Sequence, residues 1–132
     1  MNIVTFMYME TLYERIGEQE LKSILTRFYD LVYEDDRINH LFTNPKDEVI
    51  DKQVCFMTQF LGGPMLYNEK YGHPRMRMRH MPHKITPDGM GAWLENIKKA
   101  ILESSLSEDL KVAFFNSLPK LAAHMVNSSD EN

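Results

Sequence analysis

Residues 61–80 read LGGPMLYNEKYGHPRMRMRH. An apolar helical pattern stops at Gly62-Gly63-Pro64, loop-like residues follow, and three arginines alternate with methionines directly before His80. The whole chain is acidic, with a formal net charge of −4, so this dense basic run stands out against its composition. A local purpose for the arginines beside His80 is therefore indicated.

The length and composition narrow the class of protein. A chain of 132 residues predicts a single domain over residues 1–132 with one hydrophobic core. No apolar run is long enough to span a membrane, and the first residues do not resemble a secretory leader. The single cysteine, Cys55, suits a reducing compartment, so we expect a cytoplasmic protein. The acidic balance argues against a nucleic-acid partner, whose phosphates require a basic face.

The spacing of apolar residues predicts an all-α fold. Helical periodicity recurs along the chain, and no run alternates as a half-buried strand would. The first helix is expected to end at Ile16, and residues 62–85 are expected to be irregular, which in a compact domain usually indicates function. The later helices are expected to start at Glu18, at Pro45 capped by Asn44, at Pro87 capped by Thr86, and at a Ser105–Glu108 capping box, with a bend at Pro119.

Three hydrogen-bonding side chains fall on or beside apolar helix stripes. Gln53 lies on a face with Val49, Phe56, Met57 and Phe60, while Tyr29 and Trp93 belong to two other helices. Each has an ordinary explanation as a boundary or core residue. Three donors that converge in an apolar cavity would instead describe a ligand pocket.

The sequence offers His80 no evident functional partner unless the protein binds a cofactor. A zinc site needs three or four ligands, and His73, His80 and His83 are not framed by a recognisable zinc motif. Haem supplies four nitrogens itself, so that one axial histidine is sufficient. Arginines beside that histidine could bind the haem propionates through paired hydrogen bonds. This interpretation explains the basic run.

The combination of motifs resembles the truncated haemoglobins, and specifically their second group, over essentially the whole chain. The matching segments are FYDLV, HLF ending at Phe42, KQVCFMTQFLGGP, GHPRMRMRH, AWLENI and HMVN. The resemblance implies a two-over-two helical sandwich around haem. Because CxxCH is absent, the haem is expected to be haem b, held without a covalent link.

The resemblance also implies a role for individual residues. Val49 departs from the histidine that many globins place above the iron, and it cannot donate a hydrogen bond. The implied roles are His80 as the proximal iron ligand, Tyr29, Gln53, Trp93 and Val49 as the distal pocket, Phe42, Phe56 and Met57 as haem packing, and Arg79, Arg77 and Tyr67 as propionate partners.

The implied function is binding of dioxygen, with nitric oxide and carbon monoxide as further ligands, and oxygen or nitric oxide redox chemistry rather than bulk transport. Nitric oxide dioxygenase activity, peroxidase-like activity and ligand sensing stay open, and turnover would require a separate reductase. Two rivals from other classes are a haem-free helical interaction module and a metal-dependent hydrolase. A monomer or weak homodimer is expected.

Overall fold

The computed structural model describes residues 10–73 and 85–125. All regular structure in these two segments is helical, which confirms the all-α prediction. The elements are α2 (Leu12–Ile16), α3 (Glu18–Glu34), the short 3₁₀ helix η1 (Asn39–Leu41), α4 (Lys46–Phe60), α5 (Leu66–Tyr71), α7 (Pro87–Glu103), α8 (Glu108–Asn116) and α9 (Pro119–Met125).

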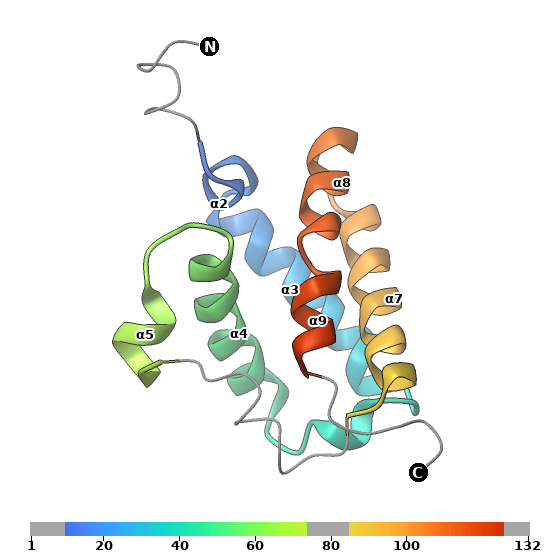
Figure 1. Cartoon of the computed structure of the whole chain (residues 1–132). Helices are drawn as coiled ribbons and strands as arrows, with labels where there is room; N and C mark the ends of the chain where they lie inside the picture. The colour runs from blue at the N-terminus through green and yellow to red at the C-terminus, as the bar shows by residue number, and fades with distance from the viewer. Residues whose placement is uncertain (1–9, 74–84, 126–132) are drawn as a thin grey trace.

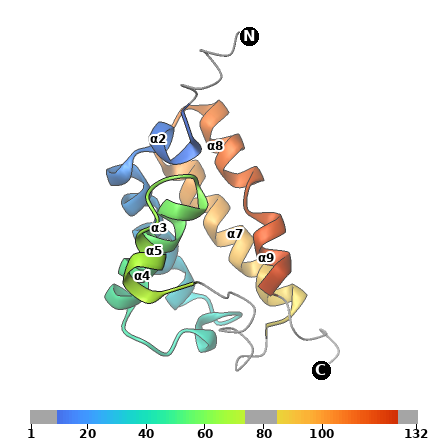
Figure 2. The same cartoon turned by 60° about the vertical axis from the view of Figure 1, so that its left-hand side comes forward.

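The main helices form two layers. Helix α3 packs against α4 on one side and against α7 on the other, and α7 in turn packs against α8 and α9. Figures 1 and 2 show α3 and α4 as one pair and α7 with α8 and α9 as the other, with α5 beside α4. This is the two-over-two arrangement expected from the sequence. Within the described segments, no helix has both the length and the apolar character needed to cross a bilayer.

Helical spacing explains which faces meet in the core. On α3, the fully buried residues include Leu21, Leu25, Phe28 and Val32, three or four positions apart. The facing helices contribute buried side chains at comparable spacing, among them Ile97, Ile101 and Phe114, and Leu118 is buried between α8 and α9. Burial of such stripes, rather than helix propensity alone, stabilises helices of this length.

Helix α4 begins one residue later than the sequence suggested. Pro45 precedes the helix instead of occupying its first position, and no side chain caps it, so the predicted Asn44 cap is wrong. The Asn44 carbonyl accepts a hydrogen bond from the Tyr33 hydroxyl at 2.8 Å, which fixes the chain before the helix. Phe60, expected on the buried face, is 37% exposed and stacks on Phe56.

The last part of the chain shows one correct and two incorrect helix boundaries. Thr86 caps α7 as predicted, because its hydroxyl accepts the Gly89 N–H at 3.0 Å. The cap of α8 is Ser107 and not Ser105, whose N–H donates to the Glu20 carboxylate instead. The expected single bent helix is two helices, since α8 ends at Asn116 and α9 starts at Pro119.

The region between α4 and α7 is less irregular than expected. Residues 66–71 form helix α5, which carries Tyr67. The side chains of Gln59 and Asn68 bond to each other at 3.1 Å, and the Asn68 N–H donates to the Gln59 side-chain oxygen at 3.0 Å. These two bonds hold α5 on the end of α4.

Gly62 and Gly63 allow α2 to lie directly against the end of α4. The Tyr13 N–H donates to the Leu61 carbonyl at 3.0 Å, which holds the two segments together. A Cβ atom at Gly63 would lie 2.5 Å from the Tyr13 ring and 2.8 Å from the Thr58 carbonyl oxygen. Because the Thr58 oxygen belongs to the backbone, it cannot move aside cheaply.

We therefore expect Gly63→Ala to lower the free energy of unfolding by about 2 kcal/mol, within the usual range for overpacking. Gly91→Ala is the matched control, because Gly91 is exposed in α7 and its added Cβ would meet nothing within 4 Å. That variant should gain roughly 0.5–1 kcal/mol from helix propensity. Urea unfolding measures both changes, and equal stability of the two variants would contradict the close-packing explanation.

Candidate functional site

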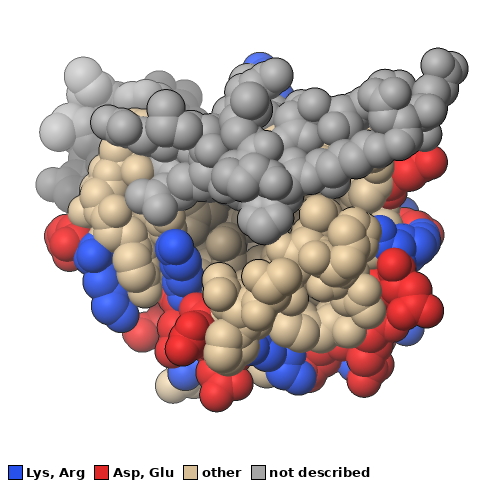
Figure 3. Space-filling view, turned by 90° about the horizontal axis from the view of Figure 1, so that it is seen from below, with Lys and Arg blue, Asp and Glu red and all other residues tan. Residues whose placement is uncertain are grey.

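A pocket of about 230 Å³ is enclosed by the two layers and α5. Its lining comes from α3, η1, α4, α5, α7 and α9 and is predominantly apolar and aromatic. Figure 3 shows the molecule from below, where uncharged side chains and one Lys or Arg side chain border a hollow and most other charged side chains lie toward the margins. The lining residues are Tyr29, Ile38, Leu41, Phe42, Thr43, Asn44, Val49, Lys52, Gln53, Phe56, Met57, Tyr67, Ile85, Met90, Trp93, Leu121 and Met125.

The structure brings together every predicted site residue that it describes. These residues come from four helices and, for Phe42, from the position directly after η1, and all line the pocket, namely Tyr29, Phe42, Val49, Gln53, Phe56, Met57, Tyr67 and Trp93. His73 is exposed and does not line it. The predicted ligand His80, the propionate partners Arg77 and Arg79, and His83 lie outside the described residues.

Aromatic contacts fix the positions of the two aromatic donors. The Phe28 ring packs edge-on against Tyr29, with ring centroids 4.6 Å apart, and against Trp93, at 5.2 Å. On its other side, Tyr29 contacts Phe42 at 5.8 Å. Tyr29 and Trp93 are only 3% and 7% exposed, respectively. A fully buried Phe28 therefore separates two polar aromatic side chains that both face the pocket.

The Tyr29 hydroxyl is a hydrogen-bond donor without a protein partner in the described part of the chain. No fully buried side-chain nitrogen or oxygen there lacks a partner, so this hydroxyl keeps a little exposed surface, and Tyr29 is a lining residue of the pocket. Desolvation by burial raises the pKa of Tyr29 well above its ordinary value, and the neighbouring Tyr33 raises it further. The hydroxyl thus keeps its proton throughout the physiological pH range.

Tyr33 provides a contrast one helical turn later. Its ring contacts the same Phe42, with centroids 5.9 Å apart, but its hydroxyl donates to the Asn44 carbonyl. Tyr33 is thus engaged in the fold, whereas the Tyr29 hydroxyl is available to the pocket. The Trp93 indole N–H and the Gln53 amide resemble Tyr29, since neither forms a side-chain hydrogen bond within the described segments.

Lys52 is a pocket residue that the sequence analysis missed. Among the lining side chains in the described part of the chain, Lys52 alone is charged. Its ammonium group lies 5.2 Å from the centroid of the Tyr71 ring, and that ring is 5.0 Å from Tyr67. Lys52 directly precedes Gln53 on α4, and this adjacency was the available signal for it.

The described residues near the pocket do not include a cluster of metal-binding side chains. Within the described segments, no group of three or more His, Cys, Asp or Glu side chains could hold a metal ion. Cys55 is a free, half-buried thiol on α4 and does not line the pocket. The described lining offers apolar packing, aromatic contact, the Lys52 cation and hydrogen-bond donors that include Tyr29, Gln53 and Trp93.

Comparison with known proteins gives consistent results. Residues 11–127 match the family model described as "Bacterial-like globin". The chain is 38% identical over 118 residues to the group 2 truncated haemoglobin YjbI of Bacillus subtilis, which covers 89% of each chain. The crystal structure of the group II truncated haemoglobin of Bacillus anthracis matches with a TM-score of 0.88 and 36% identity, over 94% of this chain and 96% of that one. A truncated oxygen-avid haemoglobin from Bacillus subtilis matches with a TM-score of 0.85 and 38% identity, over 89% and 100%.

Proposed function

The chain belongs to the bacterial-like globin family, as a truncated haemoglobin of the second group, and on this basis we propose that it holds haem b non-covalently in the pocket and retains dioxygen there. A haem cofactor and small gaseous ligands follow from the family. The observation that carries the finer proposal is the convergence of Tyr29, Gln53 and Trp93, three donors from three helices, on one apolar pocket.

The residues present suit a flat, apolar group with an anionic edge. Phe42, Phe56 and Met57 would pack against the faces of the macrocycle, since all three line the pocket. Tyr67 and Lys52, together with the predicted Arg77 and Arg79, would hold the propionates. His80 would supply the axial nitrogen, as the resemblance implies.

The distal residues would act on the diatomic ligand itself. When bound, haem supplies an iron atom that coordinates diatomic molecules and passes more negative charge to dioxygen than to carbon monoxide. Tyr29 and Trp93 would donate to that charge from fixed positions, so little reorganisation is needed. Gln53 offers a third donor, whereas Val49 can only limit space. The surrounding apolar side chains exclude water and strengthen each of these hydrogen bonds.

A pocket of this kind would favour retention of dioxygen, and redox chemistry on dioxygen, nitric oxide or peroxide, over bulk transport. One similar protein is described as oxygen-avid, which is in keeping with this proposal. Redox turnover would draw electrons from a separate reductase. Dioxygen, nitric oxide and carbon monoxide are the proposed ligands.

An absorption spectrum of the purified chain tests the proposal. We expect a Soret band that shifts on reduction with dithionite and shifts again on addition of carbon monoxide. A colourless protein that fails to take up added haem would favour the haem-free interaction module. Stoichiometric zinc or manganese in place of iron would favour the hydrolase.

The proposed propionate partners give a further prediction. Lys52→Gln and Arg79→Ala should each speed haem transfer to an acceptor protein several-fold, that is about 0.5–1 kcal/mol for one partly exposed ion pair. Raising the salt concentration should shrink this difference, because exposed charge pairs are screened. The matched control is Lys46→Gln, on the same helix, because Lys46 pairs with Asp30 at 2.8 Å and does not line the pocket. Equal haem transfer rates for all three variants would remove Lys52 and Arg79 from this role.

A further inference from the structure

Asp35 connects three walls of the pocket through its backbone and side chain. It follows the last residue of α3, six positions after Tyr29, and its N–H donates to the Val32 carbonyl at 3.1 Å. Its own carbonyl accepts the N–H groups of Ile38 at 3.0 Å and Asn39 at 2.8 Å, which turns the chain into η1. Ile38 lines the pocket directly, so this turn shapes the wall next to α3.

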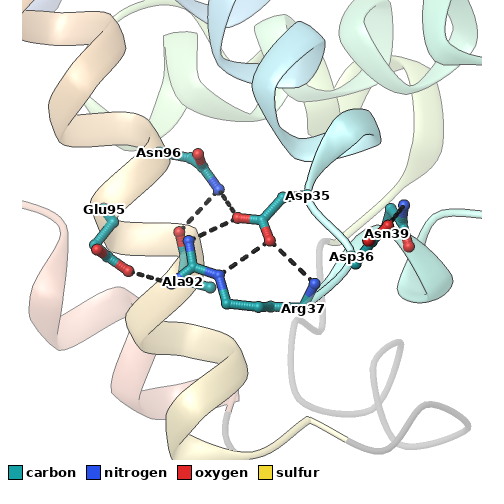
Figure 4. Close-up of polar contacts among 7 residues, drawn as sticks. All are labelled: Asp35, Asp36, Arg37, Asn39, Ala92, Glu95 and Asn96. Carbon is teal, nitrogen blue, oxygen red and sulfur yellow. Dashed lines mark hydrogen bonds and ion pairs between the residues drawn. The ribbon is translucent and has the colours of Figure 1, made fainter.

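The Asp35 carboxylate makes the third connection, to α7. One oxygen accepts the backbone N–H and Nε of Arg37, both at 3.0 Å, while the other accepts Nη2 of Arg37 at 2.7 Å and Nδ2 of Asn96 at 2.8 Å (Figure 4). These bonds hold the pKa of Asp35 well below its ordinary value, and the bonds from Arg37 contribute more than the bond from Asn96. The Asp35 side chain is 13% exposed and Asn96 is 9% exposed, so water competes little for the bond between them.

Asn96 carries this connection to the turn of α7 that bears Trp93. The same Nδ2 group that donates to Asp35 also donates to the Ala92 carbonyl at 3.0 Å. Ala92 directly precedes Trp93, so one amide holds that turn against the end of α3. The only other polar contact from this part of α7 in Figure 4 is the ion pair between Glu95 and Arg37, and both side chains are more than half exposed. Exposed pairs of this kind contribute little.

We propose that Asp35 and Asn96 are positioning residues, which hold α3 and α7 at the spacing that lets Tyr29 and Trp93 donate to the same ligand. Neither side chain lines the pocket, so both act through the helices they join. The inference rests on the proposed function for its effect on ligand binding. The placement of Trp93, however, can be measured without any ligand.

The test uses the single tryptophan as a reporter. Because the chain has one Trp, labelling with 5-fluorotryptophan gives one ¹⁹F resonance, from Trp93. Asn96→Leu removes the amide donor at similar volume, and Asp35→Asn removes the charge from the other end of the same bond. In the full chain, with carbon monoxide bound to the reduced protein, we expect both variants to shift or broaden the resonance. Dioxygen dissociation should speed up about fivefold, and carbon monoxide dissociation should hardly change.

Two controls separate positioning from a general loss of stability. Glu95→Gln cuts only the exposed ion pair with Arg37, so the resonance and both dissociation rates should stay as in the parent protein. In a Trp93→Phe background, Asn96→Leu should lose most of its effect on dioxygen dissociation, because the donor it positions is gone. The proposal would be overturned if Asn96→Leu left the Trp93 resonance unchanged. It would also be overturned if the effect of Asn96→Leu on dioxygen dissociation were as large in the Trp93→Phe background as in the parent protein. If the purified chain holds no haem, the proposed function fails, and the resonance of Asn96→Leu against that of Glu95→Gln still decides the positioning role.

Discussion

His80→Ala is expected to leave the purified protein without haem or with haem that is readily lost. A single axial histidine is the one bond between protein and iron in this proposal, so its removal would leave the haem held by packing and propionate contacts alone. Mutation of a residue that only hydrogen-bonds to a metal ligand typically weakens metal affinity 10–100-fold. Removal of the ligand itself should therefore weaken haem affinity by more than about 100-fold. The absorbance ratio of the Soret band to the protein band measures haem content directly.

His73→Ala is the matched control for this experiment. His73 is exposed and does not line the pocket, so its loss should leave haem content and spectrum unchanged. Added imidazole should restore a normal spectrum to His80→Ala, because it can supply the missing axial nitrogen. Full haem content with an unaltered spectrum in the His80 variant would assign the iron ligand elsewhere.

Tyr29→Phe and Trp93→Phe are each expected to speed dioxygen dissociation about tenfold, and about a hundredfold together. Each variant removes one donor to a ligand that bears negative charge, and such hydrogen bonds are worth about 1.5 kcal/mol or more. Carbon monoxide carries little charge, so its dissociation should change far less. Stopped-flow displacement of each gas measures the two rates in the same preparation.

Tyr33→Phe is a suitable control, because Tyr33 contacts the same Phe42 but commits its hydroxyl to the Asn44 carbonyl. It should cost some stability and leave dioxygen dissociation close to that of the parent. If the Tyr29 and Trp93 variants accelerate both gases equally, the pocket selects ligands by shape, and the electrostatic explanation is wrong.

The sequence predicted the helices better than their ends. The buried stripe of α3 depends on apolar spacing within one segment, which the sequence displays. The cap of α8 depends instead on a contact between distant segments. Ser105 and Ser107 can both cap, and the bond from the Ser105 N–H to Glu20 on α3 accompanies the choice of Ser107. The start of α4 was misplaced for a similar reason, since Tyr33 engages the Asn44 carbonyl.

The residues around the pocket were predicted more completely than its edge. Tyr29, Gln53 and Trp93 stood out because a polar group on an apolar stripe needs an explanation, and all three line one pocket. A lysine on an amphipathic helix ordinarily faces solvent, so its position next to Gln53 was too weak a signal to single out Lys52. The Asp35–Asn96 bond joins residues 61 positions apart, and no local pattern could have revealed it. The roles of individual residues stay predictions.

The pocket draws its walls from positions as far apart in the sequence as Tyr29 and Met125. Its cavity therefore cannot exist while α9 is still undocked, whatever the state of the earlier helices. Closing the long stretch of chain between such distant positions costs conformational entropy, which the contacts of the docked helices must offset. A cofactor that needs the complete lining would thus be held only by the assembled chain. Once captured, it would favour only the fully assembled chain, so every helix that lines the pocket would gain resistance to unfolding.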